Sequence, residues 1–511
     1  MIDLVWLRER TRLARCLLLA AVGVLGACTA RGAVAVNPSP APLATYVVRF
    51  GAEGDTAIAN VRARLPVRDG MLLMYPEGAE EFASGWSHFV TQLEARDTTG
   101  QPLQLEPAGR DQWRVSGAGV VDLSYRVRLL HDREPHKWQF GVKEVAYVRP
   151  DFVFSTGKAL FITNLEMPAA LVRIEPPPGG RVLASWSRFA GGENDFHISG
   201  AQELTEAMII AGTPIVRSAQ IGNTRVNIAT TRRLASSATV VEEHTRRFLP
   251  AAAAVFGATP PGTLLVLLGQ DTGYAGGGAA FEGGLSLMFP QAPGAENRAP
   301  WGHVLDHEIV HLWNGYGLRF PDDAPEYWFS EGFTDYATWM LEAAHGLVPE
   351  DTLPQVINAQ LTDYRTQAGR AAMQAVSSEK AKYYDLIYSG GFLVALALDV
   401  ELRARTGLMR GLPDMLRAMY AEFGGEGDAR YTAPDIARVA SETCACDLQP
   451  FFTAYVFGMD ILPVRQFTHQ LGIMLPDDNA PFPARTEPVD SATRRLRAAW
   501  LDGWRTSAPQ R

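Results

Sequence analysis

Residues 301–317, WGHVLDHEIVHLWNGYG, decide how the rest of the chain is interpreted. Three histidines and a glutamate stand among apolar residues, and the histidines recur at spacings of four. Residues four apart on a helix lie about 40° apart around its axis, so His307 and His311 project side by side and can reach one cation. The apolar positions on the opposite face are predicted to hold the helix against the core: Leu305, Ile309, Leu312 and Tyr316.

Glu308 lies on the flank of this helix, beside the two histidines. HEIVH therefore fits the H-E-x-x-H pattern, in which two imidazoles bind zinc and the glutamate acts as general base. The pattern also arises by chance, so a buried helix with hydrogen-bonded histidines is the alternative. His303, one turn earlier, is expected to line the cleft or to be hydrogen-bonded, because three turns of straight helix diverge from one tetrahedral centre.

The next segment, PEYWFSEGFTDYATWM, supplies a third ligand. A catalytic zinc site needs three protein ligands and one open position for water. Glu331 stands among aromatic residues, where an unpaired carboxylate is expensive to bury unless a cation faces it. Gly332 is expected to let this second helix approach the first closely. Asp335, one turn later, is expected to accept the second ring N–H of a ligating histidine; a solvated surface carboxylate is the alternative.

Composition and periodicity predict a multidomain α+β protein. The chain has 511 residues, of which 47% are hydrophobic and 20% charged, which suits several globular cores. The net charge of −9 argues against a nucleic-acid partner. Stretches such as DLSYRVRLL alternate with period two, as strands do, whereas the pattern after Pro300 is helical. The predicted domains are all-β over 45–215, catalytic over 216–406 and α-helical over 407–511, with helices at 301–316, 326–344 and 389–405.

The N-terminal residues 1–27 are interpreted as a targeting segment. Four arginines precede CLLLAAVGVL, which is too short to span a bilayer. LGAC, ending at Cys28, resembles the bacterial lipoprotein signal, in which the cysteine is lipidated; a plain cleaved signal peptide is the alternative. Residues 28–44 are predicted to tether the chain to the membrane. Thr29, rather than an aspartate, follows the cysteine, which resembles lipoproteins that are sorted by default to the outer membrane. If the source is Gram-negative, we therefore expect a lipoprotein on the periplasmic face of that membrane.

Cys444 and Cys446 are the remaining cysteines. Export permits a disulfide, but a Cys-x-Cys bridge closes a very tight ring. Two half-buried thiols are therefore expected. Without a nearby histidine the pair is a poor zinc site.

Three stretches resemble successive blocks of one peptidase family: HEIVHLWNGYGLR, WFSEGFTDY and YSGGFLVALALDVELRARTG. The family is the glycyl aminopeptidase-type zinc peptidases, gluzincins with a thermolysin-like catalytic domain. The resemblance implies a peptide substrate, one Zn²⁺ held by His307, His311 and Glu331, and Glu308 as the base. The chain after Leu471 is too short for the PDZ domain of many relatives, so we expect the short form.

The third block implies a further catalytic residue. Tyr388 precedes Ser389-Gly390-Gly391, where related aminopeptidases place a tyrosine two residues before a Lys-Gly pair. Its phenol is expected to donate a hydrogen bond to the oxyanion. Gly390 replaces the usual lysine. A tyrosine that merely caps an apolar helix is the alternative.

AAFEGGLSLMF resembles the family's edge-strand block, in which a glutamate holds the substrate's free α-amine. Glu282 falls at that glutamate and Ser286 at a serine four residues on. Backbone groups of Gly278 and Ala279 are expected to pair with an extended peptide. Gly283 replaces the usual histidine, which leaves a zinc endopeptidase as an alternative. The second alternative is a non-catalytic envelope protein that uses the same scaffold for binding.

Overall fold

The computed structural model divides the chain into Met1–Ala41 and one compact unit, Pro42–Arg511. It describes residues 43–505 apart from short gaps at 76–77, 118, 135–137, 139–140, 168, 187, 189–191, 260–261, 274–275, 426, 428, 477–482 and 488. The predicted targeting segment and Cys28 lie outside the described residues. No helix in the described part of the chain is both long enough and apolar enough to cross a membrane.

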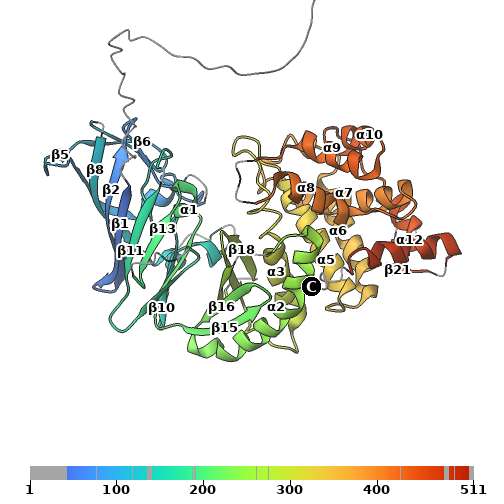
Figure 1. Ribbon diagram of the computed structural model, residues 1–511, viewed down its shortest axis with the longest axis horizontal. Coiled ribbons are helices and arrows are strands. Elements are labelled where there is room, and N and C mark those ends of the chain that lie inside the picture. The colour runs from blue at the N-terminus through green and yellow to red at the C-terminus, as the bar shows by residue number, and fades with distance from the viewer. Residues whose placement is uncertain are drawn as a thin grey trace, which may run out of the picture. The chain divides into compact units, whose positions relative to one another are not determined.

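The region before residue 213 is built from strands, blue to green in Figure 1. Its largest sheet has seven strands in the order β13-β11-β1-β2-β8-β4-β5. These are β1 (Ala44–Glu53), β2 (Thr56–Val67), β4 (Val90–Arg96), β5 (Pro102–Leu103), β8 (Gly119–Arg128), β11 (Ala170–Glu175) and β13 (Asp195–Ile198). The predicted alternation of DLSYRVRLL falls in β8, where Leu123, Tyr125 and Val127 are buried. The all-β expectation is confirmed.

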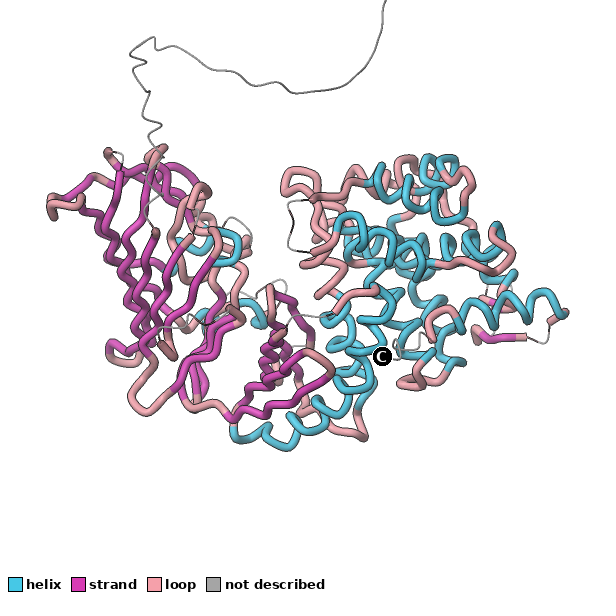
Figure 2. Tube along the Cα trace, viewed as in Figure 1, coloured by secondary structure: helices cyan, strands magenta, loops and turns pink. Residues whose placement is uncertain are grey.

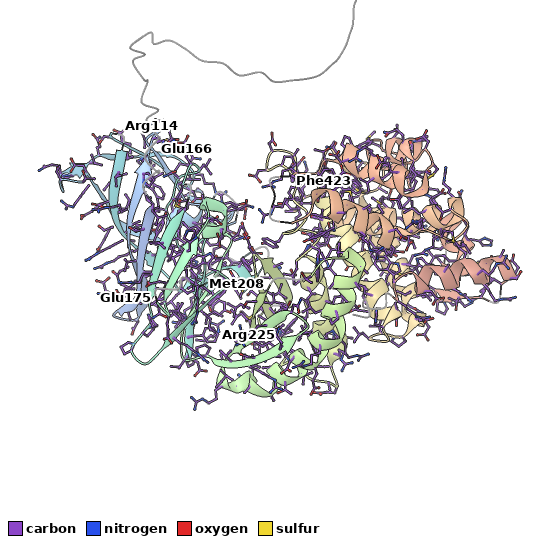
Figure 3. All side chains as sticks on the ribbon, in the orientation of Figure 1. Arg114, Glu166, Glu175, Met208, Arg225 and Phe423 are labelled. Atoms are coloured by element: carbon purple, nitrogen blue, oxygen red, sulfur yellow. A yellow bond between two sulfur atoms is a disulfide. The ribbon has the colours of Figure 1, made fainter. Side chains whose placement is uncertain are left out.

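Two smaller sheets complete this region. One has the order β12-β14-β10-β9, the other β3-β7-β6. Their strands are β3 (Met71–Leu73), β6 (Leu105–Gly109), β7 (Gln112–Val115), β9 (Tyr147–Arg149), β10 (Phe152–Thr156), β12 (Arg181–Ala184) and β14 (Met208–Gly212), with α1 (Ala201–Thr205) before β14. Met208, labelled in Figure 3, is buried where β14 meets the next sheet.

A five-stranded sheet follows, in the order β15-β16-β17-β19-β18. Its strands are β15 (Ile215–Ile221), β16 (Thr224–Thr230), β17 (Thr263–Gln270), β18 (Gly277–Phe281) and β19 (Gly284–Phe289). α2 (Ala235–Phe256) and α3 (Arg298–Val310) pack beside it. β18 is an edge strand that contacts α3, so the sheet edge lies against the helix that carries the HEIVH sequence.

The rest of the described chain is helical, as Figure 2 shows in cyan. Its helices are α4 (Tyr327–Ser330), α5 (Gly332–Ala344), α6 (Leu353–Gln367), α7 (Tyr384–Arg405), α8 (Leu412–Phe423), α9 (Ala433–Cys444), α10 (Gln449–Tyr455), α11 (Val464–Gln470) and α12 (Ser491–Asp502), with a small hairpin of β20 (Ile473–Met474) and β21 (Arg485–Thr486). They share one hydrophobic core with the five-stranded sheet. The predicted α+β class is confirmed.

Three predicted helix boundaries are wrong in ways that affect the site. α3 ends at Val310 rather than 316, so Tyr316 is half-buried in the following turns instead of on the core face of the helix. The helix predicted over 326–344 is interrupted at Glu331, between α4 and α5. α7 begins at Tyr384 rather than 389, which places Tyr388 inside the helix.

The predicted role of Gly332 is also wrong. A Cβ atom on Gly332 would lie 2.4 Å from Cα of Gly391, so the close approach that it permits is between α5 and α7. α3 is not the partner. The two glycines thus bring Glu331, just before α5, close to the helix that carries Tyr388.

Cys444 and Cys446 form a disulfide, contrary to the expectation of two thiols. The intervening Ala445 ends α9 in the left-handed conformation, with φ 49° and ψ 41°. This turn brings the Cα atoms of the cysteines to 5.1 Å, within the usual range for a bridge. The tight ring is accommodated by the backbone of one residue.

A buried carboxylate is expected to make the stability of the protein pH-dependent. Asp111 is 1% exposed and accepts a hydrogen bond from the backbone N–H of Ser87 at 2.7 Å. Burial raises the pKa of Asp111 to about 6. Because the folded state holds its proton more tightly than the unfolded chain, its contribution is complete at acid pH and is lost as pH rises through about 6.

Between about pH 4 and 7 the wild type is therefore expected to lose roughly 2–3 kcal/mol of unfolding free energy, and Asp111→Asn is expected not to show this loss. Urea unfolding of both proteins across this range measures the effect. Asp55→Asn, at an exposed turn, is the matched control and should track the wild type. Parallel pH curves for Asp111→Asn and wild type would refute the assignment.

Candidate metal centre

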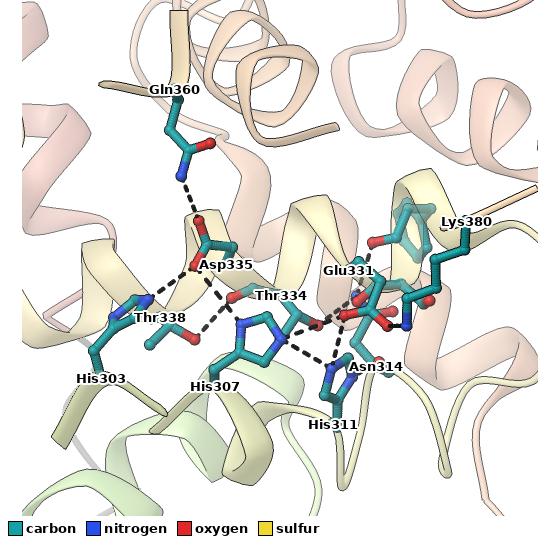
Figure 4. A network of polar contacts seen from close by, with 12 residues as sticks. His303, His307, His311, Asn314, Glu331, Thr334, Asp335, Thr338, Gln360 and Lys380 are labelled. Carbon is teal, nitrogen blue, oxygen red and sulfur yellow. Dashed lines mark hydrogen bonds and ion pairs between the residues drawn. The ribbon is translucent and has the colours of Figure 1, made fainter. Parts of the chain in front are cut away.

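His307, His311 and Glu331 direct their side-chain ends at one point (Figure 4). The two Nε2 atoms are 3.1 Å apart, and they lie 3.4 Å and 3.3 Å from Oε2 of Glu331. The histidines come from the last turn and C-cap of α3, and Glu331 comes from the break between α4 and α5. The structure thus brings together the three residues that the sequence singled out as metal ligands.

The spacing of these three atoms fits a zinc ion. Two ligand atoms bound tetrahedrally at about 2.0–2.1 Å from zinc lie about 3.3 Å apart. Two imidazole nitrogens and one carboxylate oxygen are also a donor set that catalytic zinc sites use, with the fourth position left for water. The residues present therefore fit the metal.

A backbone partner fixes the orientation of the His311 imidazole, and a carboxylate lies near that of His307. Nδ1 of His311 donates to the backbone carbonyl of Asn314 at 2.9 Å, which leaves Nε2 free to bind a metal. The side-chain amide of Asn314 donates in turn to Oγ1 of Thr334 at 3.1 Å, which ties the end of α3 to α5. Nδ1 of His307 lies 3.7 Å from Oδ1 of Asp335, which is near but longer than a hydrogen bond.

Asp335 connects the centre to a second layer of polar groups. Its Oδ1 accepts from Nε2 of His303 at 2.9 Å, and its Oδ2 accepts from Gln360 at 2.9 Å. His303 also donates from Nδ1 to Glu342 at 3.0 Å and stacks on Trp339. Burial disfavours the charged imidazole, but the two carboxylates outweigh it and raise the pKa of His303 to about 9. His303 thus stays charged at neutral pH and holds Asp335 in place.

Lys380 is a functional candidate that the sequence did not reveal. It lies in the connection between α6 and α7, 49 positions beyond Glu331, and its Nζ is 2.5 Å from Oε1 of Glu331. Burial opposes the charged carboxylate, but the charge of Lys380 and the contacts with His307 and His311 outweigh it and lower the pKa of Glu331 well below its usual range. No spacing in the sequence links the two residues, so only the fold could show this contact.

Tyr388 lies beside the same carboxylate. The ammonium of Lys380 is 5.3 Å from the centroid of its ring, and Tyr384, one turn earlier, stacks on it at 4.3 Å. Burial and the negative charge of Glu331 raise the pKa of the Tyr388 phenol well above its usual range. The hydroxyl therefore stays protonated and can donate a hydrogen bond.

Glu308 is 8% exposed and packs directly on β18. A Cβ atom on Gly278 would lie 2.4 Å from Cγ of Glu308 and 2.7 Å from its Oε1. Glycine is therefore required at 278 for the carboxylate to keep this position. The same closeness sets the backbone of Gly278 next to the predicted base.

The outer edge of β18 is partly occupied. The hydroxyl of Tyr316 donates to the backbone carbonyl of Ala280 at 2.8 Å. Successive residues of a strand point their backbone groups to alternate edges, so those of Gly278 face the same outer side as Ala280, and those of Ala279 face β19. Of the two backbone positions predicted to pair with substrate, Gly278 is the one directed outward.

Glu282 stands in the turn after β18, with 43% of its side chain exposed and 3.6 Å from the guanidinium of Arg319. Both residues line a groove of about 1880 Å³, together with Trp313 and Tyr316. Ser286, the other predicted substrate contact, is completely buried in β19, and its hydroxyl has no hydrogen-bond partner among the described residues. We therefore leave Ser286 out of the substrate site.

Comparison with known proteins agrees with this geometry. Residues 302–390 match the family model of the M61 glycyl aminopeptidases, a segment that holds the three candidate ligands, Glu308, Lys380 and Tyr388. No curated protein matches the chain.

Solved structures share the fold at low identity. An aminopeptidase N family protein from Idiomarina loihiensis is 17% identical with a TM-score of 0.72, over 86% of this chain and 81% of that one. An M1 zinc metallopeptidase from Deinococcus radiodurans is 16% identical with a TM-score of 0.57, over 82% of this chain and 94% of that one. A variant of the latter, bound to a Tyr-Ser-Ala substrate, is 16% identical with a TM-score of 0.54, over 82% and 95%.

Proposed function

We propose that this chain, a glycyl aminopeptidase-type gluzincin in its catalytic segment 302–390, is a zinc-dependent aminopeptidase. The observation that carries the proposal is the triangle of two imidazole nitrogens and one carboxylate oxygen, with sides of 3.1–3.4 Å, beside a buried glutamate. A single Zn²⁺ held by His307, His311 and Glu331 satisfies this geometry.

When bound, zinc supplies a Lewis acid that polarises the scissile carbonyl and acidifies water. Glu308 takes the proton of the attacking water and delivers it to the leaving amine. Tyr388 donates a hydrogen bond to the oxygen on which negative charge develops. Asp335, which His303 holds in place, lies 3.7 Å from Nδ1 of His307 and is positioned to orient that imidazole, as the partners of metal-bound histidines do.

Two features support a peptide with a free N-terminus as the substrate. The outward backbone groups of Gly278 lie next to Glu308 and can pair with an extended chain. Glu282 stands in the turn that directly follows β18, four residues beyond Gly278. We assign Glu282 as the carboxylate that holds the α-amine. A zinc endopeptidase is the second candidate, favoured by the contact of Glu282 with Arg319, which gives this carboxylate a partner other than an α-amine.

Hydrolysis of alanine and glycine para-nitroanilides is expected to stop with a chelator and to return with one equivalent of Zn²⁺. N-acetylation of a peptide substrate removes the charged amine, so turnover is expected to fall about 10- to 100-fold through loss of a charged hydrogen bond. Glu282→Gln should reduce this preference. Equal turnover of free and acetylated peptides would favour the endopeptidase, and activity insensitive to chelators would overturn the metal assignment.

The localisation is a separate proposal, supported by the N-terminal sequence alone. The arginine-rich start, the short apolar stretch and LGAC support export and lipidation at Cys28. We place the enzyme at the periplasmic face of the outer membrane, where it would meet exported peptides. Replacement of Cys28 by serine, followed by fractionation of cells, tests the anchor.

A further inference from the structure

The two oxygens of the Glu331 carboxylate face different partners (Figure 4). Oε2 lies 3.4 Å and 3.3 Å from the Nε2 atoms of His307 and His311. Oε1 lies 2.5 Å from Nζ of Lys380, on the side away from the imidazoles. One carboxylate oxygen thus faces the candidate metal position, and the other is paired with the ammonium of Lys380.

The surroundings of Lys380 keep its ammonium in this place. Its side chain is 26% exposed, and Nζ lies 5.0 Å and 5.3 Å from the ring centroids of Tyr327 and Tyr388. Both rings offer their faces to the cation, which stabilises it there. Tyr327 precedes Glu331 by one helical turn and Tyr388 comes from α7, so the ammonium connects two elements of the site.

The lysine that relatives carry two residues after the tyrosine would start from another place in the site. A Cβ atom on Gly390 would point at Cε of Met373 and at the ring of Tyr364, 2.8 Å and 3.2 Å away. A side chain there leads toward α6. Lys380 contacts Glu331 from the connection between α6 and α7, which is a different position in the chain from 390.

We propose that Lys380 is a positioning residue that holds Glu331 as a one-oxygen ligand of the metal. The proposal rests on the zinc centre proposed above. Without the ammonium, Oε1 is free to turn toward the ion, and a carboxylate that binds through both oxygens would take up the position that a catalytic site keeps open for water. The ammonium also lies beside the ring of the Tyr388 phenol that is to stabilise the oxyanion.

The test uses the full-length protein loaded with Zn²⁺ for kinetics and with Co²⁺ for spectroscopy. Lys380→Met is expected to keep one equivalent of metal and to lower kcat by about 10- to 100-fold, the range seen when a partner of a metal-bound side chain is removed. KM should change much less than kcat. The visible Co²⁺ absorption should weaken, because added coordination moves the ion away from tetrahedral geometry. Lys380→Arg should restore both the spectrum and most of kcat.

Lys382→Met is the matched control. Lys382 is two residues away, 65% exposed and paired with Glu379, so its loss should leave both readouts unchanged. A wild-type Co²⁺ spectrum and kcat in Lys380→Met would overturn the proposal. So would equal damage by Lys380→Arg and Lys380→Met at unchanged thermal stability. A wild-type protein that binds Co²⁺ but cleaves no peptide would refute the proposed function, while the spectra of the variants would still decide the role of Lys380.

Discussion

Glu308→Gln is expected to lower kcat by roughly 10²- to 10⁴-fold while the protein keeps its zinc, because the amide cannot accept the proton of the attacking water. The three candidate ligand atoms belong to other residues and are unaffected. Glutamine has nearly the same shape as glutamate, so it also fits the narrow space against Gly278. The loss should therefore appear in turnover rather than in folding or metal content.

Metal analysis and kinetics on one preparation measure this effect. Glu243→Gln, an exposed glutamate of α2, is the control for the substitution itself and should behave as wild type. If Glu308→Gln retained near wild-type turnover, another group would have to be the base. If it lost its metal, Glu308 would be a ligand instead.

Asp399→Ala is expected to destabilise the helical region by about 3–5 kcal/mol, since it leaves a buried guanidinium without its carboxylate. Asp399 is fully buried, and one oxygen accepts from Nε of Arg403 and the backbone N–H of Leu412, each at 2.9 Å. The other oxygen accepts from the hydroxyl of Tyr336 and the indole N–H of Trp504, each at 3.0 Å. The carboxylate thus joins α5, α7 and the segment after α12.

The midpoint of thermal or urea unfolding, followed by circular dichroism, measures this loss. Glu401→Ala removes a partly exposed carboxylate of the same helix, paired with Arg405, and should cost less than about 1 kcal/mol. Asp399→Asn keeps the shape and most acceptors, so its effect should fall between the two. Equal midpoints for Asp399→Ala and Glu401→Ala would show that the network adds nothing to stability.

The sequence predicted the parts of this protein that local rules govern. Period-two alternation identified strands such as β8 because one face of each is buried. The spacing of His307 and His311 placed them on one helical face, and the cost of burying Glu331 without a cation pointed to the third ligand. In each case the physical reason acts within a few residues of the chain, or concerns one side chain and its burial.

Contacts between distant segments were beyond this reasoning. Lys380 reaches Glu331 from an irregular connection, and Gly332 meets Gly391 rather than α3. The end of α3 at Val310 moved Tyr316 from the core to the sheet edge, because helix ends depend on tertiary contacts. The bond between Cys444 and Cys446 depended on the backbone conformation of one alanine.

The hydrogen bond from Tyr316 to Ala280 has a consequence for where a substrate would be cut. An unoccupied sheet edge lets an extended chain pair in several registers, each shifted by two residues. With the Ala280 carbonyl already taken, the outward groups of Gly278 remain, directly beside Glu308. The occupied Ala280 carbonyl removes the registers that would use it, so we expect the sheet edge itself to narrow which bond faces the base.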